Sequence, residues 1–64
     1  MNWTTVKEYE DITYKKSNGV ARIAFNRPEV RNAFRPKTLF EMYEAFSDAK
    51  EDNSIGVVLL SAEG

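Results

Sequence analysis

Three arginines stand four residues apart in the middle of the chain, and they are the side chains whose type and spacing could do chemistry. Arg27, Arg31 and Arg35 recur among two prolines and several small residues. A guanidinium group keeps its charge at ordinary pH and can hold a phosphate through two parallel hydrogen bonds. The spacing therefore predicts a loop that binds a phosphorylated ligand.

An interpretation without a ligand is open for two of these arginines. Arg27 and Arg35 could instead pair with nearby acidic residues, while Asn32 could hydrogen-bond the loop to itself. Asn26 is interpreted as a turn former, because asparagine readily hydrogen-bonds its own backbone. Arg31 is the arginine for which we favour a phosphate contact.

The chain offers no evident catalytic group. It contains no histidine and no cysteine, and its glycines stand alone, so neither a dinucleotide fingerprint nor a P-loop occurs. Two small acidic clusters exist, and they comprise Glu8, Glu10 and Asp11 near the start and Glu51 and Asp52 further on. We interpret both clusters as solvated surface charge. The sequence therefore predicts no catalytic residue and no metal site.

Charge and composition exclude several classes of protein. A net charge of −1 gives no general attraction to nucleic acid or to anionic lipid. No apolar stretch approaches the roughly 18 residues that would span a bilayer, and the start has no apolar signal core. We expect a cytoplasmic protein that binds neither nucleic acid nor membrane.

The length predicts an incomplete domain. A chain of 64 residues buries only about 60% of the surface that its unfolded form exposes, and it lacks the cysteines or histidines that staple small domains. The sequence also stops directly after an apolar run. We expect residues 1–64 to be the N-terminal portion of a larger protein, with residues 1–9 as an arm.

Two strands joined by a tight turn follow the arm. Residues 11–16 alternate between polar and apolar side chains, which is the period of a half-buried strand. Asn18 and Gly19 then provide the positive φ angles of a hairpin turn. Residues 20–26 form the second strand of the predicted hairpin, and Arg27-Pro28 ends it.

An amphipathic helix is expected from Pro36 to about Asp52, because proline suits the first turn of a helix. Its predicted buried face repeats at steps of three and four residues and comprises Leu39, Met42, Tyr43, Phe46 and Ala49, with Glu41, Glu44, Asp48 and Lys50 on the other side. Core packing is also expected for the aromatic residues at strand or helix spacing, which are Tyr14, Phe25, Phe40, Tyr43 and Phe46.

A buried strand completes the predicted fold class, which is α/β. Residues 55–60 are short and almost uniformly apolar, as in a parallel strand that is covered on both faces. The second strand, the helix and this strand would then form a right-handed βαβ crossover.

The loop sequence resembles that of the crotonase (enoyl-CoA hydratase/isomerase) superfamily. Asn26-Arg27-Pro28 followed by Asn32-Ala33 is similar to the loop by which this family holds part of coenzyme A. The variant Asn32-Ala33-Phe34-Arg35-Pro36 looks like the branch that makes 1,4-dihydroxy-2-naphthoyl-CoA for menaquinone. The resemblance extends to Tyr9-Glu10-Asp11-Ile12 before the loop and to 53–60 after it.

The resemblance implies a fold, an activity and a site. The fold would be the opening of a crotonase-like spiral of ββα repeats, and the full protein would be a trimeric or hexameric enzyme acting on an acyl-CoA. In that branch the reaction is an intramolecular Claisen-type ring closure of o-succinylbenzoyl-CoA, and some members use bicarbonate. The residues implied to contact coenzyme A are Arg31, Asn32 and Ala33.

The resemblance places the catalytic groups beyond Gly64. In the family, both N–H donors of the oxyanion hole and the bases lie further along the chain, so no catalytic residue is assigned here. Two alternatives stay open. The full protein could be another acyl-CoA hydratase, isomerase or hydrolase of the family, or the chain could be a non-catalytic α/β interaction fragment whose arginine-rich loop is merely solvated.

Overall fold

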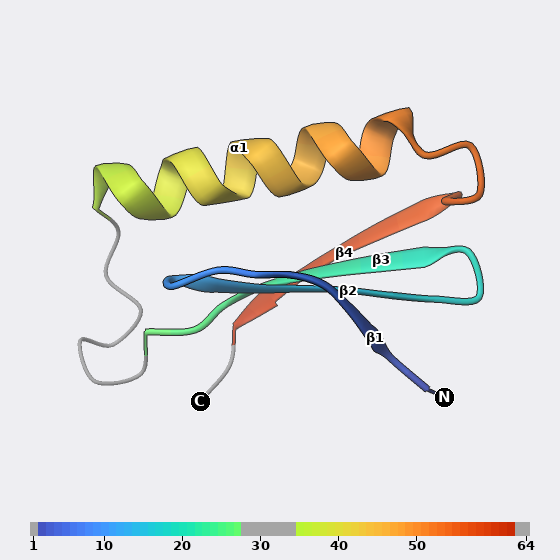
Figure 1. Cartoon of the computed structure of the whole chain (residues 1–64), viewed down its shortest axis with the longest axis horizontal. Helices are drawn as coiled ribbons and strands as arrows, with labels where there is room; N and C mark the ends of the chain where they lie inside the picture. The colour runs from blue at the N-terminus through green and yellow to red at the C-terminus, as the bar shows by residue number, and fades with distance from the viewer. Residues whose placement is uncertain (1, 28–34, 63–64) are drawn as a thin grey trace.

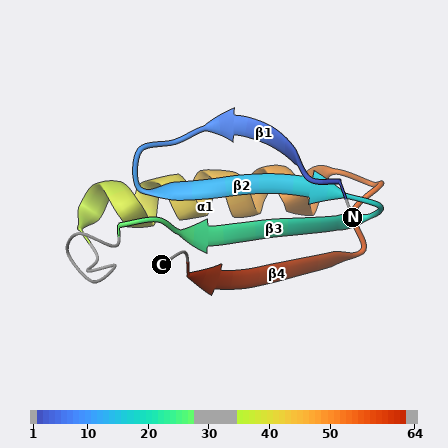
Figure 2. The same cartoon turned by 90° about the horizontal axis from the view of Figure 1, so that it is seen from below.

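Four strands and one helix make up a two-layer α/β structure. The computed structural model describes residues 2–27 and 35–62. Its elements are β1 (Thr4–Glu8), β2 (Ile12–Ser17), β3 (Val20–Phe25), α1 (Pro36–Glu51) and β4 (Val57–Ala62). The strands lie side by side in the order β1-β2-β3-β4, and α1 covers one face of this sheet (Figures 1 and 2). The predicted α/β class is confirmed.

The predicted hairpin is present as β2 and β3. These strands pair antiparallel over their whole length, from Ile12 opposite Phe25 to Ser17 opposite Val20. Asn18 (φ 47°) and Gly19 (φ 82°) form the turn, and both occupy the left-handed region that asparagine and glycine tolerate best. The local sequence signal thus sets the register of the two central strands.

The crossover from β3 through α1 to β4 is also confirmed. β4 pairs parallel with β3, from Val20 opposite Val57 to Phe25 opposite Ala62, so the strand lies two residues later than predicted. The carbonyl of Gly19 accepts hydrogen bonds from the backbone N–H groups of Gly56 (2.8 Å) and Val57 (3.3 Å). The hairpin turn therefore also anchors the start of β4.

The core lies between α1 and the two central strands. Ile12, Tyr14, Ala21 and Ile23 of the sheet meet Ala45 and Ala49 of the helix, and all are nearly inaccessible to solvent. Alanine on the helix lets the two backbones approach closely, so the larger side chains of the sheet fill the layer between them. Tyr14 packs in the core as predicted.

The face of α1 that packs on the sheet differs from the predicted face. The buried helix residues are Thr38, Glu41, Ala45 and Ala49, whereas Leu39, Phe40, Tyr43 and Phe46 are exposed. The prediction of core packing for Phe40, Tyr43 and Phe46 is therefore wrong. The buried position predicted for Leu39 and the solvent-facing position predicted for Glu41 are wrong as well. Hydrogen bonds to Glu41 explain the difference, because they make burial of that carboxylate tolerable and turn the apolar stripe outwards.

The predicted arm at the N-terminus contains a strand. β1 pairs antiparallel with β2, and the register shifts between Thr5 and Lys7. All five of its side chains are exposed, so no burial pattern marks it in the sequence. The irregularity between Thr5 and Lys7 further disrupts the alternation that a regular strand would show.

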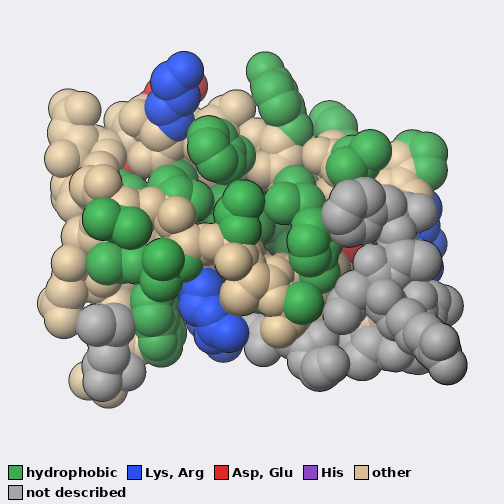
Figure 3. Space-filling model, turned by 180° about the vertical axis from the view of Figure 1, so that it is seen from behind, with side chains coloured by type: hydrophobic (Ala, Val, Ile, Leu, Met, Phe, Trp, Pro, Cys, Tyr) green, Lys and Arg blue, Asp and Glu red, His purple; other side chains and the backbone are tan. Residues whose placement is uncertain are grey.

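β4 is an edge strand in the described residues. The sequence predicts a strand that is covered on both faces, and this prediction is wrong. Val57, Leu59 and Leu60 are exposed, while Val58 packs against the core. Figure 3 shows hydrophobic side chains gathered over the back of the molecule, interrupted by basic groups. The described residues therefore leave two apolar surfaces open, one on β4 and one on the outer side of α1.

The hairpin turn should tolerate substitution poorly. We expect Gly19→Ala to lower the free energy of unfolding by roughly 1 to 2 kcal/mol, because a side chain disfavours the left-handed region. Gly56→Ala is the matched control, since an added Cβ there meets nothing within 4 Å. Urea unfolding followed by helix circular dichroism measures both, and equal losses in the two variants would contradict the role assigned to the turn.

The apolar edge should make the isolated chain associate. We expect the 64-residue chain to form oligomers as its concentration rises, because an exposed apolar edge strand invites pairing with another strand. Leu60→Lys should shift sedimentation towards the monomer. Val6→Lys on the irregular, polar β1 edge should not. A wild-type chain that sediments as a tight monomer, with well-protected amides in β4, would count against this expectation.

Candidate functional site

A buried carboxylate lies where the connection from β1 to β2 meets the start of α1. Asp11 is 1% exposed. Its Oδ2 accepts a hydrogen bond from Nε of Arg35 at 2.7 Å, and its Oδ1 accepts one from Nη2 of Arg35 at 2.6 Å. This two-pronged pair fixes both the position and the plane of the guanidinium group.

The first turn of α1 depends on the same carboxylate. Thr38 donates its hydroxyl hydrogen bond to Oδ2 of Asp11 at 2.7 Å, and its Oγ1 accepts one from the backbone N–H of Arg35 at 3.3 Å. Arg35 is the residue before the helix, and its carbonyl accepts from the N–H of Thr38 at 2.9 Å. The hydroxyl group of Thr38 thus links the helix start to Asp11.

The end of β3 also converges on Asp11. The backbone N–H of Asn26 donates to the carbonyl of Asp11 at 2.8 Å, and Nε of Arg27 lies 3.8 Å from Oδ1 of Asp11. The N–H of Asp11 donates in turn to Oε1 of Glu41 in the second turn of α1, at 2.8 Å. One residue therefore contacts both ends of the connection between β3 and α1.

The electrostatics of this cluster favour the ionised pair. The hydrogen bonds from Arg35 hold the pKa of Asp11 well below its usual range, against the opposing effect of burial. The same bonds raise the pKa of Arg35, with a second contribution from Glu10, whose Oε2 accepts from Nη2 of Arg35 at 3.0 Å. The interpretation of Asp11 as solvated charge is wrong, whereas Glu10 is exposed as expected.

These contacts agree with the interpretation of the outer arginines that involves no ligand. Arg35 pairs with acidic residues, as the interpretation without a ligand proposed, and Arg27 has Asp11 within ion-pair distance. Arg31, Asn32 and Ala33 lie outside the described residues, so their contact with a ligand stays a prediction. Arg27 follows the carboxyl end of β3, and open α/β sheets commonly bind ligands at that edge.

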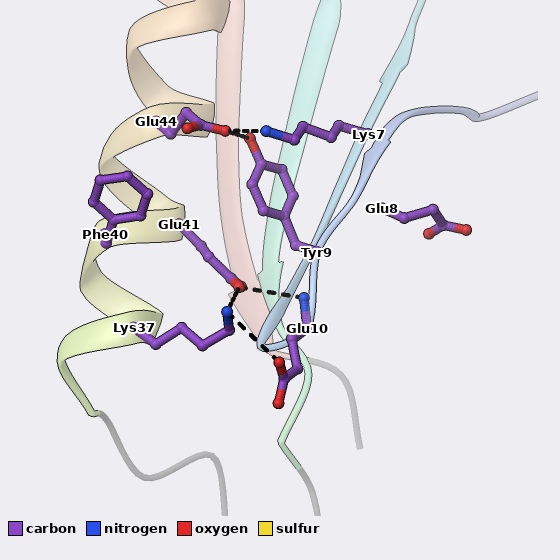
Figure 4. Close-up of a pocket in the computed structure, with 8 residues that line it drawn as sticks. All are labelled: Lys7, Glu8, Tyr9, Glu10, Lys37, Phe40, Glu41 and Glu44. Carbon is purple, nitrogen blue, oxygen red and sulfur yellow. Dashed lines mark hydrogen bonds and ion pairs between the residues drawn. The ribbon is translucent and has the colours of Figure 1, made fainter.

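A shallow hollow lies between the β1–β2 connection and the first half of α1 (Figure 4). Lys37 lies 3.6 Å from Glu10 and 3.7 Å from Glu41, and Lys7 pairs with Glu44. In the close-up, Glu8 points away from the hollow. The polar groups inside it bind one another, so the hollow lacks the set of convergent groups that a ligand site needs.

A second polar cluster lies towards the far end of α1. Asp48 accepts hydrogen bonds from the hydroxyl of Tyr14 at 2.6 Å and from Lys16 at 3.2 Å, and Lys16 also pairs with Asp52 at 2.6 Å. Burial, with the bond to Asp48, raises the pKa of Tyr14 to about 12. Asp52 and Ser54 form a turn that ends the helix, as predicted from this stretch. This cluster ties the helix to β2 at a distance from the arginine-rich segment.

Metal and membrane features are not found within the described ranges. Residues 2–27 and 35–62 contain no group of three or more possible metal-ligating side chains. Over that same part of the chain, no helix has the length and apolar character to cross a membrane.

Sequence reasoning missed two members of the Asp11 cluster. Asp11 precedes a strand, which is typical of surface charge, and Thr38 looks like an ordinary helix residue. The available signal was the spacing from Arg35 to Thr38, since a hydroxyl three residues into a helix often bonds back to the residue before it. Nothing local pointed to Asp11, because the two side chains that hydrogen-bond its carboxylate lie 24 and 27 residues away.

Comparison with known proteins agrees with this architecture. The sequence pattern of the enoyl-CoA hydratase/isomerase family matches residues 15–64. The structure superposes on a probable enoyl-CoA hydratase from Mycobacterium thermoresistibile with a TM-score of 0.82 and 42% identity, over 84% of this chain. A probable enoyl-CoA hydratase from Mycobacterium smegmatis gives a TM-score of 0.81 and 42% identity over 83% of this chain.

A third structure shows the same fold at lower identity. An enoyl-CoA hydratase/isomerase from Mycobacterium paratuberculosis matches with a TM-score of 0.86 and 26% identity over 89% of this chain. The chain spans only 23%, 22% and 22% of these three proteins respectively, so it corresponds to the opening portion of a crotonase fold. On the family pattern and the two relatives at 42% identity, this chain belongs to the enoyl-CoA hydratase/isomerase family.

Proposed function

We propose that this chain supplies the coenzyme A-binding segment of an acyl-CoA-processing enzyme. The observation that carries the proposal is that Asp11 contacts both Arg27, which follows β3, and Arg35, which precedes α1. In the sequence these two arginines flank residues 28–34. Arg31 is the middle residue of that segment in the sequence, and a guanidinium group suits a phosphate. Asn32 and Ala33 would border its adenine side.

The reaction that we propose is ring closure of o-succinylbenzoyl-CoA to 1,4-dihydroxy-2-naphthoyl-CoA. The support is the sequence Asn32-Ala33-Phe34-Arg35-Pro36, which resembles that branch of the family. This Claisen-type condensation needs two N–H donors that stabilise the thioester enolate and the later oxyanion. Those donors and the bases would come from residues other than 1–64, and the full enzyme would be a trimer or hexamer. Nothing in the described residues supports a bicarbonate site, and we derive no step through it.

Hydration of an enoyl-CoA is the second candidate. It is favoured by the two probable enoyl-CoA hydratases that are 42% identical to this chain. Both reactions pass through a thioester enolate, and both would use the same segment to hold the cofactor. The segment recognises coenzyme A rather than the acyl group, so it fits either reaction.

Substrate turnover separates the two candidates. We expect a full-length protein that carries these residues to convert o-succinylbenzoyl-CoA and to hydrate crotonyl-CoA poorly, while the purified 64-residue chain converts neither, because the oxyanion donors are not in it. Product formation, measured by absorbance and mass spectrometry, distinguishes the two reactions. Efficient crotonyl-CoA hydration alone would replace the synthase with the hydratase, and turnover of either substrate by the 64-residue chain would contradict the assignment of the catalytic groups.

Replacement of Arg31 tests the phosphate contact. In the full-length protein, Arg31→Ala should weaken acyl-CoA binding by roughly 1 to 2 kcal/mol, because one charge-assisted and partly solvated contact is lost. KM should rise about tenfold with little change in kcat, since the contact serves the ground state and the transition state alike. Lys50→Ala removes an exposed positive charge at the far end of α1 and should leave KM unchanged. An unchanged KM for Arg31→Ala would contradict the proposal.

A further inference from the structure

The tip of the β2–β3 hairpin carries the one asparagine of this sequence that is followed by a glycine. Asn18 is exposed, and Gly19 comes directly after it. The ladder between the two strands ends at Ser17 opposite Val20, so both residues lie in the loop outside the paired strands. Asn18 is therefore accessible to water, and the residue after it has no side chain that would hinder a reaction at its amide.

The chemistry of an asparagine-glycine pair is an attack within the chain on the side-chain amide. The backbone nitrogen of Gly19 bonds to Cγ of Asn18, and the bond from Cγ to the amide nitrogen breaks. The proton of the Gly19 N–H leaves with that nitrogen as ammonia. Water then opens the cyclic imide at either carbonyl, which gives aspartate or isoaspartate. In isoaspartate the backbone runs through Cγ and is longer by one carbon.

Asn53 provides a comparison within the same chain. It is exposed as well, but the residue after it is Ser54, whose side chain crowds the attacking nitrogen. The backbone N–H of Ser54 also donates to Oδ1 of Asp52 at 2.9 Å. The nitrogen that would attack Asn53 is therefore already held in a hydrogen bond, and the structure favours reaction at Asn18.

The folded turn slows this reaction without preventing it. Asn18 and Gly19 adopt φ angles of 47° and 82°, and the pairing of Ser17 with Val20 holds them in a tight turn. Closure of the imide ring needs a rotation about the backbone of Asn18. The reaction therefore proceeds from molecules in which the end of the hairpin has opened locally, and such openings cost much less than global unfolding.

The start of β4 depends on the same turn. The carbonyl of Gly19 accepts from the N–H groups of Gly56 at 2.8 Å and Val57 at 3.3 Å. A Cβ placed on Gly19 would lie 3.4 Å from the carbonyl oxygen of Ser54, so this segment packs closely against the turn. The turn and the connection from α1 to β4 lie at the same end of the molecule (Figures 1 and 2). A longer turn would therefore displace the acceptor that fixes β4.

We propose that Asn18 is a site of spontaneous deamidation and that isoaspartate at this position releases the start of β4. The additional backbone carbon lengthens the loop, and loop length sets the register of a hairpin. The carbonyl of Gly19 then no longer faces the N–H groups of Gly56 and Val57. Aspartate has a different effect, since it keeps the normal backbone and, like asparagine, tolerates the left-handed region.

Ageing of a full-length protein that carries these residues tests the site. The protein is incubated at mildly alkaline pH, where the attacking nitrogen loses its proton more readily, and is digested at intervals for mass spectrometry. We expect Asn18 to be converted about tenfold faster than Asn53, whose attacking nitrogen would first have to give up a hydrogen bond, and faster still in urea. Equal conversion of Asn18 and Asn53 in the folded protein, or conversion of Asn18 in urea alone, would contradict the proposal.

Hydrogen exchange tests the consequence for β4. Molecules that carry isoaspartate are separated from unmodified molecules by chromatography. The amides of Gly56 and Val57 should exchange about tenfold faster in them, because each amide loses its hydrogen bond to the turn. The amides of Tyr14 and Ile23, which are paired in the middle of the hairpin, should stay protected. Equal exchange at Gly56 and Val57 in the two fractions would overturn the proposed release of β4.

Two variants separate the backbone change from the change in charge. Freshly purified Asn18→Asp carries the negative charge on a normal backbone, so exchange at Gly56 and Val57 should match that of wild type. Asn18→Gly removes the reactive amide but keeps a residue that tolerates a φ of 47°, so ageing should not loosen β4 in it. Faster exchange in fresh Asn18→Asp, or loosening of β4 in aged Asn18→Gly, would show that isoaspartate at this position is not the cause.

Discussion

The burial of one carboxylate organises the part of this structure that bears on function. A charge at the position of Asp11 is costly unless it is neutralised and fully hydrogen-bonded. Its donors come from places that are remote in sequence, namely the guanidinium of Arg35 and the hydroxyl of Thr38, with Arg27 at 3.8 Å. Satisfying that single group therefore requires the start of β2, the end of β3 and the start of α1 to meet at one point.

The packing of α1 follows from the same requirement. Thr38 and Glu41 must face the Asp11 cluster, and the helical repeat then directs Ala45 and Ala49 onto the sheet. The larger apolar residues are left on the outer side, where Tyr43 is 75% exposed and Phe40 is 65% exposed. Polar contacts place the start of α1, and alanines place the rest of it. The apolar stripe of α1 therefore does not mark the face that is buried.

Local signals in the sequence predict the helix and strands of this fold, but they predict the contacts between these elements less well. The turn at Asn18-Gly19, the proline that opens α1 and the apolar run of β4 each act within a few residues, and the structure confirms the hairpin, the helix and the parallel crossover. Local signals do not predict β1, because its side chains are all exposed and its pairing register with β2 shifts. The pattern of polar and apolar residues is informative only where burial imposes it.

The sequence predicts the charge of the candidate site but not the partner of each arginine. The spacing of Arg27, Arg31 and Arg35 indicates a cationic segment, but each arginine could bind a phosphate or an internal carboxylate. The structure pairs Arg35 with Asp11 and Glu10, so its guanidinium group already has carboxylate partners. That assignment depends on which acidic residue the fold brings near, and no local pattern carries this information.

The central claim is that Arg35 pairs with the carboxylates of Asp11 and Glu10, whereas Arg31 binds the cofactor. A crystal structure of a full-length protein that carries these residues, with coenzyme A bound, tests this most directly. The account predicts a phosphate oxygen within hydrogen-bonding distance of the Arg31 guanidinium group, while Arg35 keeps its two bonds to Asp11. A bound cofactor whose phosphates are held by Arg35, with Arg31 turned away from them, would contradict it.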